Sequence, residues 1–140
     1  MYLLDTNVIS EIRKAESGKT DKNVITWARS VPSDSLYVSV ITIMELEMGV
    51  LSIERKDQQQ GKVLRHWLDH QVLPTFVKRI LPIDTGIAQC CARLHIPDRK
   101  SERDALIAAT AITHGMTVVT RNVDDFNLTG VKLQNPWIFE

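Results

Sequence analysis

Four short apolar runs recur along the chain. The first three are followed by helix-like stretches, and the fourth by a short turn or helix over residues 121–126. The runs cover residues 1–4, 36–41, 80–83 and 116–120. Strands that alternate with helices pair in parallel, because each helix carries the chain back to the same end of the sheet. The sequence therefore predicts an α/β fold with a parallel, twisted sheet of about four or five strands and helices on both faces.

The stretches between these runs carry signals for helix starts and stops. Asp84 and Ser101 are suitable N-caps, Gly115 is a suitable stop, and Pro74 is expected to kink or break the helix that contains it. We expect helices over residues 6–14, 23–27, 42–51, 57–79, 85–95 and 101–114. Residues 131–133 are expected to add an edge strand.

Length and composition limit the kind of protein this can be. The chain has 140 residues, of which 44% are hydrophobic, and its 17 basic and 17 acidic side chains cancel. Cys90 and Cys91 are adjacent, so they form no disulfide framework and indicate small core residues in a reducing compartment. No apolar run approaches the ~18 residues of a membrane span. We expect a single domain over residues 1–140 of a soluble, cytoplasmic protein.

Acidic and amide side chains follow the predicted strands at several points. Asp5 comes directly after the first apolar run, and Glu45 and Asp104 lie near the starts of two predicted helices. Asn122, Asp124 and Asp125 follow the fourth run. Ligands of open α/β sheets bind beyond the carboxyl ends of the strands. The sequence therefore predicts that acids from distant segments meet at one edge of the sheet.

The same acids have a purely structural interpretation. Thr42 with Glu45, and Ser101 with Asp104, match the capping-box pattern, and Asp5 is a possible N-cap. Acids in a first helical turn contribute about 0.3–1 kcal/mol. Several carboxylates at one edge would, however, repel each other, and a divalent cation relieves that repulsion. Such an ion binds oxygen ligands and activates water, which favours a metal site.

Four sequence blocks carry a resemblance to a known family. They are LLDTNVIS at 3–10, TIMELEMG at 42–49, SERDALIAATA at 101–111 and VVTRNVDDF at 118–126. In this order and spacing they resemble the signature blocks of PIN-domain ribonucleases, and more closely the VapC toxins of bacterial type II toxin–antitoxin pairs. The closing Asn135-Pro136-Trp137 is similar to the FitB-like branch. The resemblance extends from residue 1 to about residue 137.

The resemblance implies a Mg²⁺- or Mn²⁺-dependent endoribonuclease. By resemblance, Asp5 and Asp104 bind the metal most directly, and Glu45 binds it through water or orients the nucleophile. Supporting hydrogen bonds are expected from Thr6, Asn7 and Thr120. A metal-activated water would attack the phosphodiester in line, leaving 5′-phosphate and 3′-hydroxyl ends.

The fourth site position is less regular. Many members of the family have Asp directly after the Thr-Arg pair, where this chain has the neutral Asn122. Asp125 follows three residues later, and a short helix would bring it to the same face. Either residue remains a candidate for the fourth position.

The resemblance also implies partners. A VapC-like toxin forms a homodimer and inhibits growth and translation unless it is bound by a DNA-binding antitoxin of the VapB or FitA type, with which it makes a higher assembly in the bacterial cytoplasm. RNA is the implied substrate. Basic residues near the acids are candidates for RNA binding, and they are Arg99, Lys100, Arg103 and Arg121.

Two other functions remain open at this stage. The neutral Asn122 is also compatible with a PIN-like module that binds RNA or protein without turnover. A structural α/β domain, whose acids only cap helices, is the third interpretation.

Overall fold

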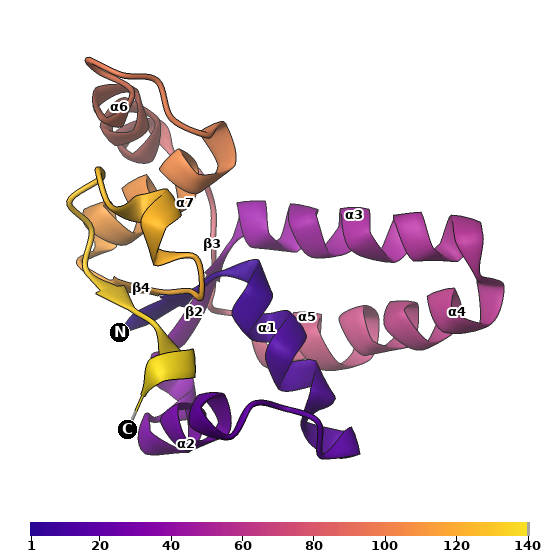
Figure 1. Ribbon diagram of the computed structural model, residues 1–140. Coiled ribbons are helices and arrows are strands. Elements are labelled where there is room, and N and C mark those ends of the chain that lie inside the picture. The colour runs from indigo at the N-terminus through magenta and orange to yellow at the C-terminus, as the bar shows by residue number, and fades with distance from the viewer. Residues whose placement is uncertain (140) are drawn as a thin grey trace.

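The structure, a computed structural model, describes residues 1–139 (Figure 1). It is built on a five-stranded sheet with the strand order β3-β2-β1-β4-β5. All neighbouring strands are parallel. The strands are β1 (Tyr2–Leu4), β2 (Leu36–Ser39), β3 (Ile80–Leu81), β4 (Thr117–Val119) and β5 (Leu133–Gln134). The predicted α/β fold with a parallel sheet is confirmed, and the expected edge strand forms at Leu133–Gln134.

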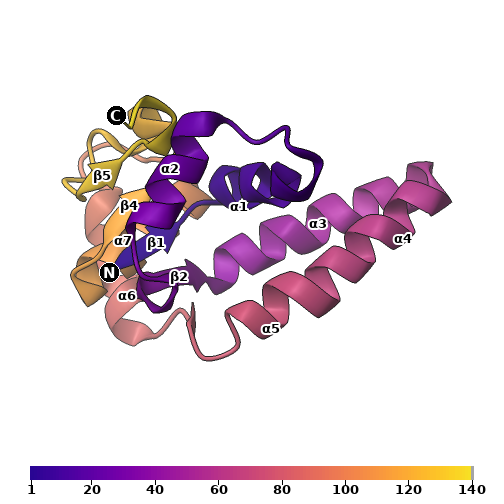
Figure 2. The ribbon, with the colours of Figure 1, turned by 90° about the horizontal axis from the view of Figure 1, so that it is seen from below.

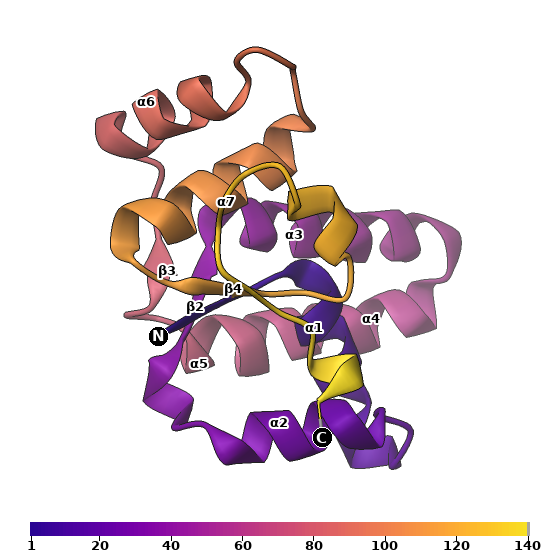
Figure 3. The ribbon, with the colours of Figure 1, turned by 60° about the vertical axis from the view of Figure 1, so that its left-hand side comes forward.

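Helices cover both faces of the sheet, as predicted (Figure 3). They are α1 (Thr6–Ile12), α2 (Lys22–Ser30), α3 (Val40–Lys56), α4 (Gln58–Trp67), α5 (Leu73–Thr75), α6 (Thr85–Leu94) and α7 (Glu102–His114). Successive strand residues point to opposite faces. Leu3 accordingly packs with Ile107 of α7, whereas Leu4 packs in a separate cluster with Val8 and Trp27.

The strand order places a switch point at the centre of the sheet. From β1 the chain continues to β2 on one side, and β4 occupies the other side of β1. The connections on either side of such a point diverge and leave a crevice at the carboxyl ends of the two strands. Asp5 lies at this point, where its backbone N–H donates to the carbonyl of Val119 at 2.9 Å.

Helix α3 begins earlier than the sequence suggested. Ser39 is its N-cap, because its hydroxyl accepts a hydrogen bond from the backbone N–H of Ile41 at 3.0 Å. Thr42 is therefore a fully buried residue inside the helix, and Glu45 lies in the second turn. The predicted capping box of Thr42 and Glu45 is wrong.

The structure also refines the predicted starts of two other helices. Asp21, rather than Asn23, caps α2, because its carboxylate accepts from the backbone N–H groups of Asn23 and Val24. Helix α7 follows Ser101, whose side chain makes no cap hydrogen bond, and it ends at Gly115 as expected. Asp104 lies in the first turn of α7.

Helices α3 and α4 run side by side as an arm that extends from the sheet (Figure 2). Gly61 of α4 makes this close approach possible, because a Cβ atom there would lie 2.6 Å from Cα of Glu54. The helix predicted over residues 57–79 instead passes from α4 through a π-helical segment, Leu68–Val72, into α5 and ends at Thr75. The π-helical segment ends two residues before Pro74, which lacks an N–H and disfavours regular α-helix.

The two cysteines belong to the core between α6 and α7. Cys90 and Cys91 are both free and buried, and they pack with Ile87, Ala105 and Ala109. Their predicted role as small core residues is confirmed. Within residues 1–139, no helix combines the length and the apolar composition that a membrane crossing requires.

Candidate active site

Asp5 is held rigidly at the end of β1. Its side chain is only 7% exposed. One carboxylate oxygen, Oδ1, accepts from the backbone N–H of Thr6 at 2.8 Å. The other, Oδ2, accepts from the Thr120 hydroxyl at 2.8 Å and from Asn7 Nδ2 at 3.3 Å. Three donors from two strand ends therefore fix the orientation of this carboxylate.

Asn7 and Thr120 join β1 to the segment after β4. Asn7 Nδ2 also contacts the Thr120 hydroxyl at 3.3 Å, and Asn7 Oδ1 accepts from the backbone N–H of Arg121 at 3.2 Å. The Thr120 hydroxyl accepts from the backbone N–H of Asn122 at 3.0 Å. These hydrogen bonds place Asn122 and the short 3₁₀ helix Val123–Phe126 beside Asp5.

Glu45 reaches the same region from α3. Its Oε1 accepts from the Thr6 hydroxyl at 2.7 Å, which ties α3 to the start of α1. Its Oε2 lies 3.4 Å from Nη1 of Arg103, a residue of α7. Both oxygens of Glu45 therefore have a partner within the chain.

Asp104 completes a group of interacting carboxylates. Burial, more than any other cause, raises the pKa of Asp104, and the negative charges of Asp5, Asp125 and Glu45 raise it further. Burial likewise raises the pKa of Asp5, although hydrogen bonds from Thr120 and Thr6 oppose the shift. Glu45 and Asp125 add to it by charge repulsion. The negative charges of Glu45 and Asp125 thus disfavour the ionised forms of Asp5 and Asp104.

The two candidates for the fourth position differ in what they add. Asn122 is exposed, and its side chain makes no cap hydrogen bond to the 3₁₀ helix that it precedes. Asp125, on that helix, carries a charge that acts on both Asp5 and Asp104. The neighbouring Asp124 instead accepts from Asn127 Nδ2 at 3.1 Å.

The four basic residues that were predicted to bind RNA lie in different surroundings. Arg103 contacts Glu45, and the Arg121 guanidinium lies over the Trp137 ring, 5.2 Å from its centroid. Arg99 pairs with Glu102 at 2.5 Å on the exposed start of α7. Lys100 Nζ turns back into its own loop and donates to the carbonyl of Leu94 at 2.7 Å.

The donor set fits a hard divalent cation. The four acids offer only carboxylate oxygens, and their mutual repulsion is relieved by a positive ion. Within residues 1–139, no three His, Cys, Asp or Glu side chains are close enough to enclose a metal by themselves. Water and phosphate oxygens would have to complete the shell, which is the usual arrangement for Mg²⁺.

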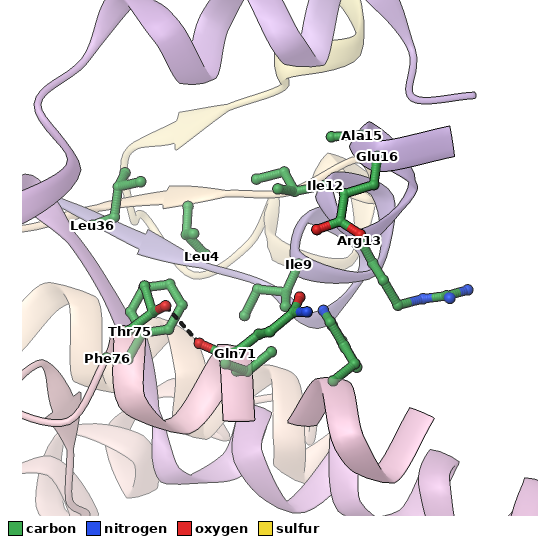
Figure 4. Close-up of a pocket in the computed structure, with 12 residues that line it drawn as sticks. Leu4, Ile9, Ile12, Arg13, Ala15, Glu16, Leu36, Gln71, Thr75 and Phe76 are labelled. Carbon is green, nitrogen blue, oxygen red and sulfur yellow. Dashed lines mark hydrogen bonds between the residues drawn. The ribbon is translucent and has the colours of Figure 1, made fainter. Parts of the chain in front are cut away.

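A separate apolar pocket of about 340 Å³ lies beside α1 (Figure 4). Ile9 and Ile12 of α1 face Phe76, and Arg13 and Glu16 add charge at the pocket. The described residues that line it include none of the four acids. The pocket is therefore a second surface, independent of the acidic site.

Comparison with known proteins shows the family to which the chain belongs. A family model described as the PIN domain matches residues 2–131. The chain belongs to the PIN-domain family. The sequence blocks that suggested this resemblance contain the four acids and the Thr120 strand end described above.

Relatives within the family are similar over the full length. VapC ribonuclease Y4jK of Sinorhizobium fredii is 35% identical over an alignment of 142 residues that covers 98% of each chain. Toxin FitB of Neisseria gonorrhoeae is also 35% identical, over 98% of this chain and 99% of its own. The crystal structure of FitAcB from Neisseria gonorrhoeae matches with a TM-score of 0.88, over 99% of this chain and 100% of that chain. The predicted resemblance to VapC toxins of the FitB-like branch is confirmed.

Sequence reasoning missed the partners of Glu45. Arg103 was proposed as an RNA contact and Thr6 as a general support, but the structure shows both bound to the Glu45 carboxylate. Both contacts depend on how α3 packs against α1 and α7. A local sequence pattern does not predict how these helices pack. The one available signal was that Arg103 directly precedes Asp104 in the same sequence block.

Proposed function

We propose that this chain is the toxin of a type II toxin–antitoxin pair and that it acts as a divalent-metal-dependent endoribonuclease. Relatives named as a ribonuclease and as a toxin match the chain end to end at 35% identity. The observation that carries the proposal is the convergence of Asp5, Glu45, Asp104 and Asp125 at the switch point of the sheet, where the pKa values of Asp5 and Asp104 are raised.

Each acid has a distinct part in the proposed reaction. Asp5 and Asp104 would hold Mg²⁺ or Mn²⁺, with Asp5 oriented by Thr120 and Asn7. When bound, the ion would supply Lewis acidity toward the phosphodiester and an activated water. Glu45, positioned by Thr6, would bind the ion through that water, orient the water and accept its proton.

Asp125 is the better candidate for the fourth position. Its negative charge acts on both Asp5 and Asp104, which favours binding of a cation between them. Asn122 would contribute through its backbone N–H, which already holds Thr120 in place. We therefore expect Asp125→Asn to weaken metal binding, whereas the adjacent Asp124→Asn leaves it unchanged.

The proposed partner is a DNA-binding antitoxin of the FitA or VapB type. Solved relatives include the FitAcB complex and a FitAB complex bound to a DNA fragment. The apolar pocket beside α1 suits an apolar segment of such a partner. Ala15→Asp, at the exposed edge of this pocket, should then weaken antitoxin binding without changing RNA cleavage.

We also propose that the toxin is a homodimer in the bacterial cytoplasm. Met44, Met48 and Leu51 lie on one side of α3 and are 42%, 50% and 54% exposed. An apolar stripe of this kind favours self-association. Sedimentation of the antitoxin-free chain tests the proposed stoichiometry.

RNA cleavage by the purified, antitoxin-free chain tests the nuclease proposal. Total cellular RNA would be incubated with Mg²⁺, with Mn²⁺ and with EDTA, and the fragment ends mapped. Asp104→Asn should lose metal-dependent cleavage, whereas Glu102→Gln, in the same turn of α7 but paired with Arg99, should keep it. A folded chain that cleaves nothing in either metal would instead support the binding module, and tight RNA binding without turnover would establish it.

A further inference from the structure

The Glu45 carboxylate is already paired with a cation that belongs to the chain itself. Arg103 Nη1 lies 3.4 Å from Glu45 Oε2, while the Thr6 hydroxyl occupies Oε1. Among the ion pairs formed by residues 1–139, this pair alone involves one of the four acids. The guanidinium therefore lies against the one Glu45 oxygen that has no other partner.

The ion pair between Arg103 and Glu45 is weak enough for another cation to displace Arg103. The side chains of Arg103 and Glu45 are 49% and 24% exposed, and they make one contact of 3.4 Å rather than a bidentate pair. Exposed single contacts of this kind are weak and are screened by salt. A doubly charged ion attracts the same carboxylate more strongly than a single guanidinium does. The guanidinium and a metal ion, or its bound water, would compete for the same Oε2, because Oε1 already accepts from Thr6.

We propose that Arg103 is a tethered competitor of the divalent metal for Glu45. This inference rests on the proposed function, because it assumes that the acids bind a metal. In the metal-free chain Arg103 satisfies Glu45, and when the metal binds, Arg103 is displaced and remains one residue from Asp104 at the rim of the site. Arg103 thereby raises the metal concentration at which the site becomes occupied.

Arg99 provides a matched control for this proposal. It lies four residues before Arg103 and carries the same charge, but its ion pair is with Glu102, and both side chains are well exposed at 77% and 69%. Removing Arg99 changes the net charge by the same amount as removing Arg103. Only Arg103, however, contacts an acid of the site.

The direct test is Mn²⁺ binding by the full chain without RNA, followed by the electron paramagnetic resonance signal of free Mn²⁺. Arg103→Gln should bind Mn²⁺ about two- to fivefold more tightly than the parent chain, the range expected from loss of one exposed ion pair. Arg99→Gln should bind as the parent does. The gain of Arg103→Gln should shrink in high salt, because screening weakens the original pair.

A Glu45→Gln background separates competition from an indirect effect. In that background Arg103→Gln should give no further gain, because the contested carboxylate is absent. An unchanged or weaker Mn²⁺ affinity of Arg103→Gln, or an equal gain in Arg99→Gln, would overturn the inference while leaving the nuclease proposal intact. If neither the parent chain nor Arg103→Gln binds Mn²⁺, the proposed metal site itself fails.

Discussion

Helix α3 contributes acids to two clusters of carboxylates, and the chain neutralises these two clusters to different extents. Glu45 and Glu47 are two residues apart on α3. Glu47 faces the arm, where the Arg65 guanidinium contacts it at 2.6 Å, Glu54 at 3.1 Å and Asp69 at 3.5 Å. We call these three acids and Arg65 the arm cluster. In this cluster the guanidinium of Arg65, on α4, contacts two acids of α3 and one acid of the π-helical segment Leu68–Val72.

The pKa shifts of the two clusters have opposite signs. A hydrogen bond from Arg65 lowers the pKa of Glu47. Burial and neighbouring negative charges raise the pKa values of Asp5 and Asp104. In a helix-packing region the chain supplies its own counter-charge, whereas at the sheet edge it leaves most of the negative charge uncompensated. That difference, rather than the number of acids, separates the proposed metal site from a structural ion-pair network.

The largest predicted difference between the clusters is in catalysis. Glu45→Gln should reduce RNA cleavage by about 10²- to 10⁴-fold, the usual contribution of a general base. Glu47→Gln, which removes the same charge two residues away, should leave the cleavage rate unchanged. Initial rates on a defined RNA at saturating Mn²⁺ measure both. Equal losses in the two variants would show that the two clusters are not functionally distinct.

Stability of the arm should respond most to a change at Gly61. Gly61→Ala places a Cβ 2.6 Å from backbone Cα of Glu54 and separates α3 from α4. Such overpacking costs about 1–3 kcal/mol of the free energy of unfolding. Denaturant titration measures the loss, and the contacts of Arg65 with Glu54 should weaken with it.

Gly49 supplies the control for this prediction. It lies inside α3, and a Cβ there would meet no atom within 4 Å. Gly49→Ala should therefore stabilise the protein by about 0.5–1 kcal/mol, because alanine favours helix over glycine. If Gly61→Ala were stabilising as well, the close approach of α3 and α4 would not hold in solution.

Metal binding should stabilise the folded chain through the four acids of the candidate site, and the arm cluster should not contribute. At a free Mn²⁺ concentration ten times its Kd, the free energy of unfolding should increase by about 1.4 kcal/mol. Asp5→Asn should lose this gain, whereas Glu47→Gln in the arm cluster should keep it. Thermal unfolding with and without Mn²⁺ makes the comparison, and an undiminished gain in Asp5→Asn would place the metal elsewhere.

Much of this architecture could be predicted from the sequence because its signals are local. Asp5 and Thr120 end apolar runs, so their meeting at the carboxyl edge followed from parallel pairing alone. The start of α3 was misplaced because Ser39 and Thr42 are both plausible caps, and only the packing shows which hydroxyl is used. The contact of Arg103 with Glu45 could not be predicted, because it depends on the relative placement of two helices that are 46 residues apart, α3 ending at Lys56 and α7 beginning at Glu102.

The smallest predicted effect is a difference in how stability depends on pH, since Asp104 is only half-buried and solvent screens its interactions. For Asp104 the folded pKa lies above its ordinary value of 3.8. Folding therefore disfavours its ionised form, and the metal-free chain loses stability as pH rises through 3.8 toward the folded pKa. For Glu47 the folded pKa lies below its ordinary value of 4.5, so its stabilising effect is present above 4.5 and is lost as pH falls through the folded pKa.

Two variants test the expected difference in pH dependence between Asp104 and Glu47. Relative to the parent chain without metal, Asp104→Asn should become more stable as pH rises from about 4 to about 7. Glu47→Gln should be less stable than the parent at about pH 7, and the difference should vanish in acid. Saturating Mn²⁺ should reverse the first trend, because the bound cation favours ionised Asp104, and should leave the second unchanged. If both variants followed the same pH trend, Asp104 would be compensated within the chain as Glu47 is, and the uncompensated charge that distinguishes the sheet edge would have to reside in Asp5.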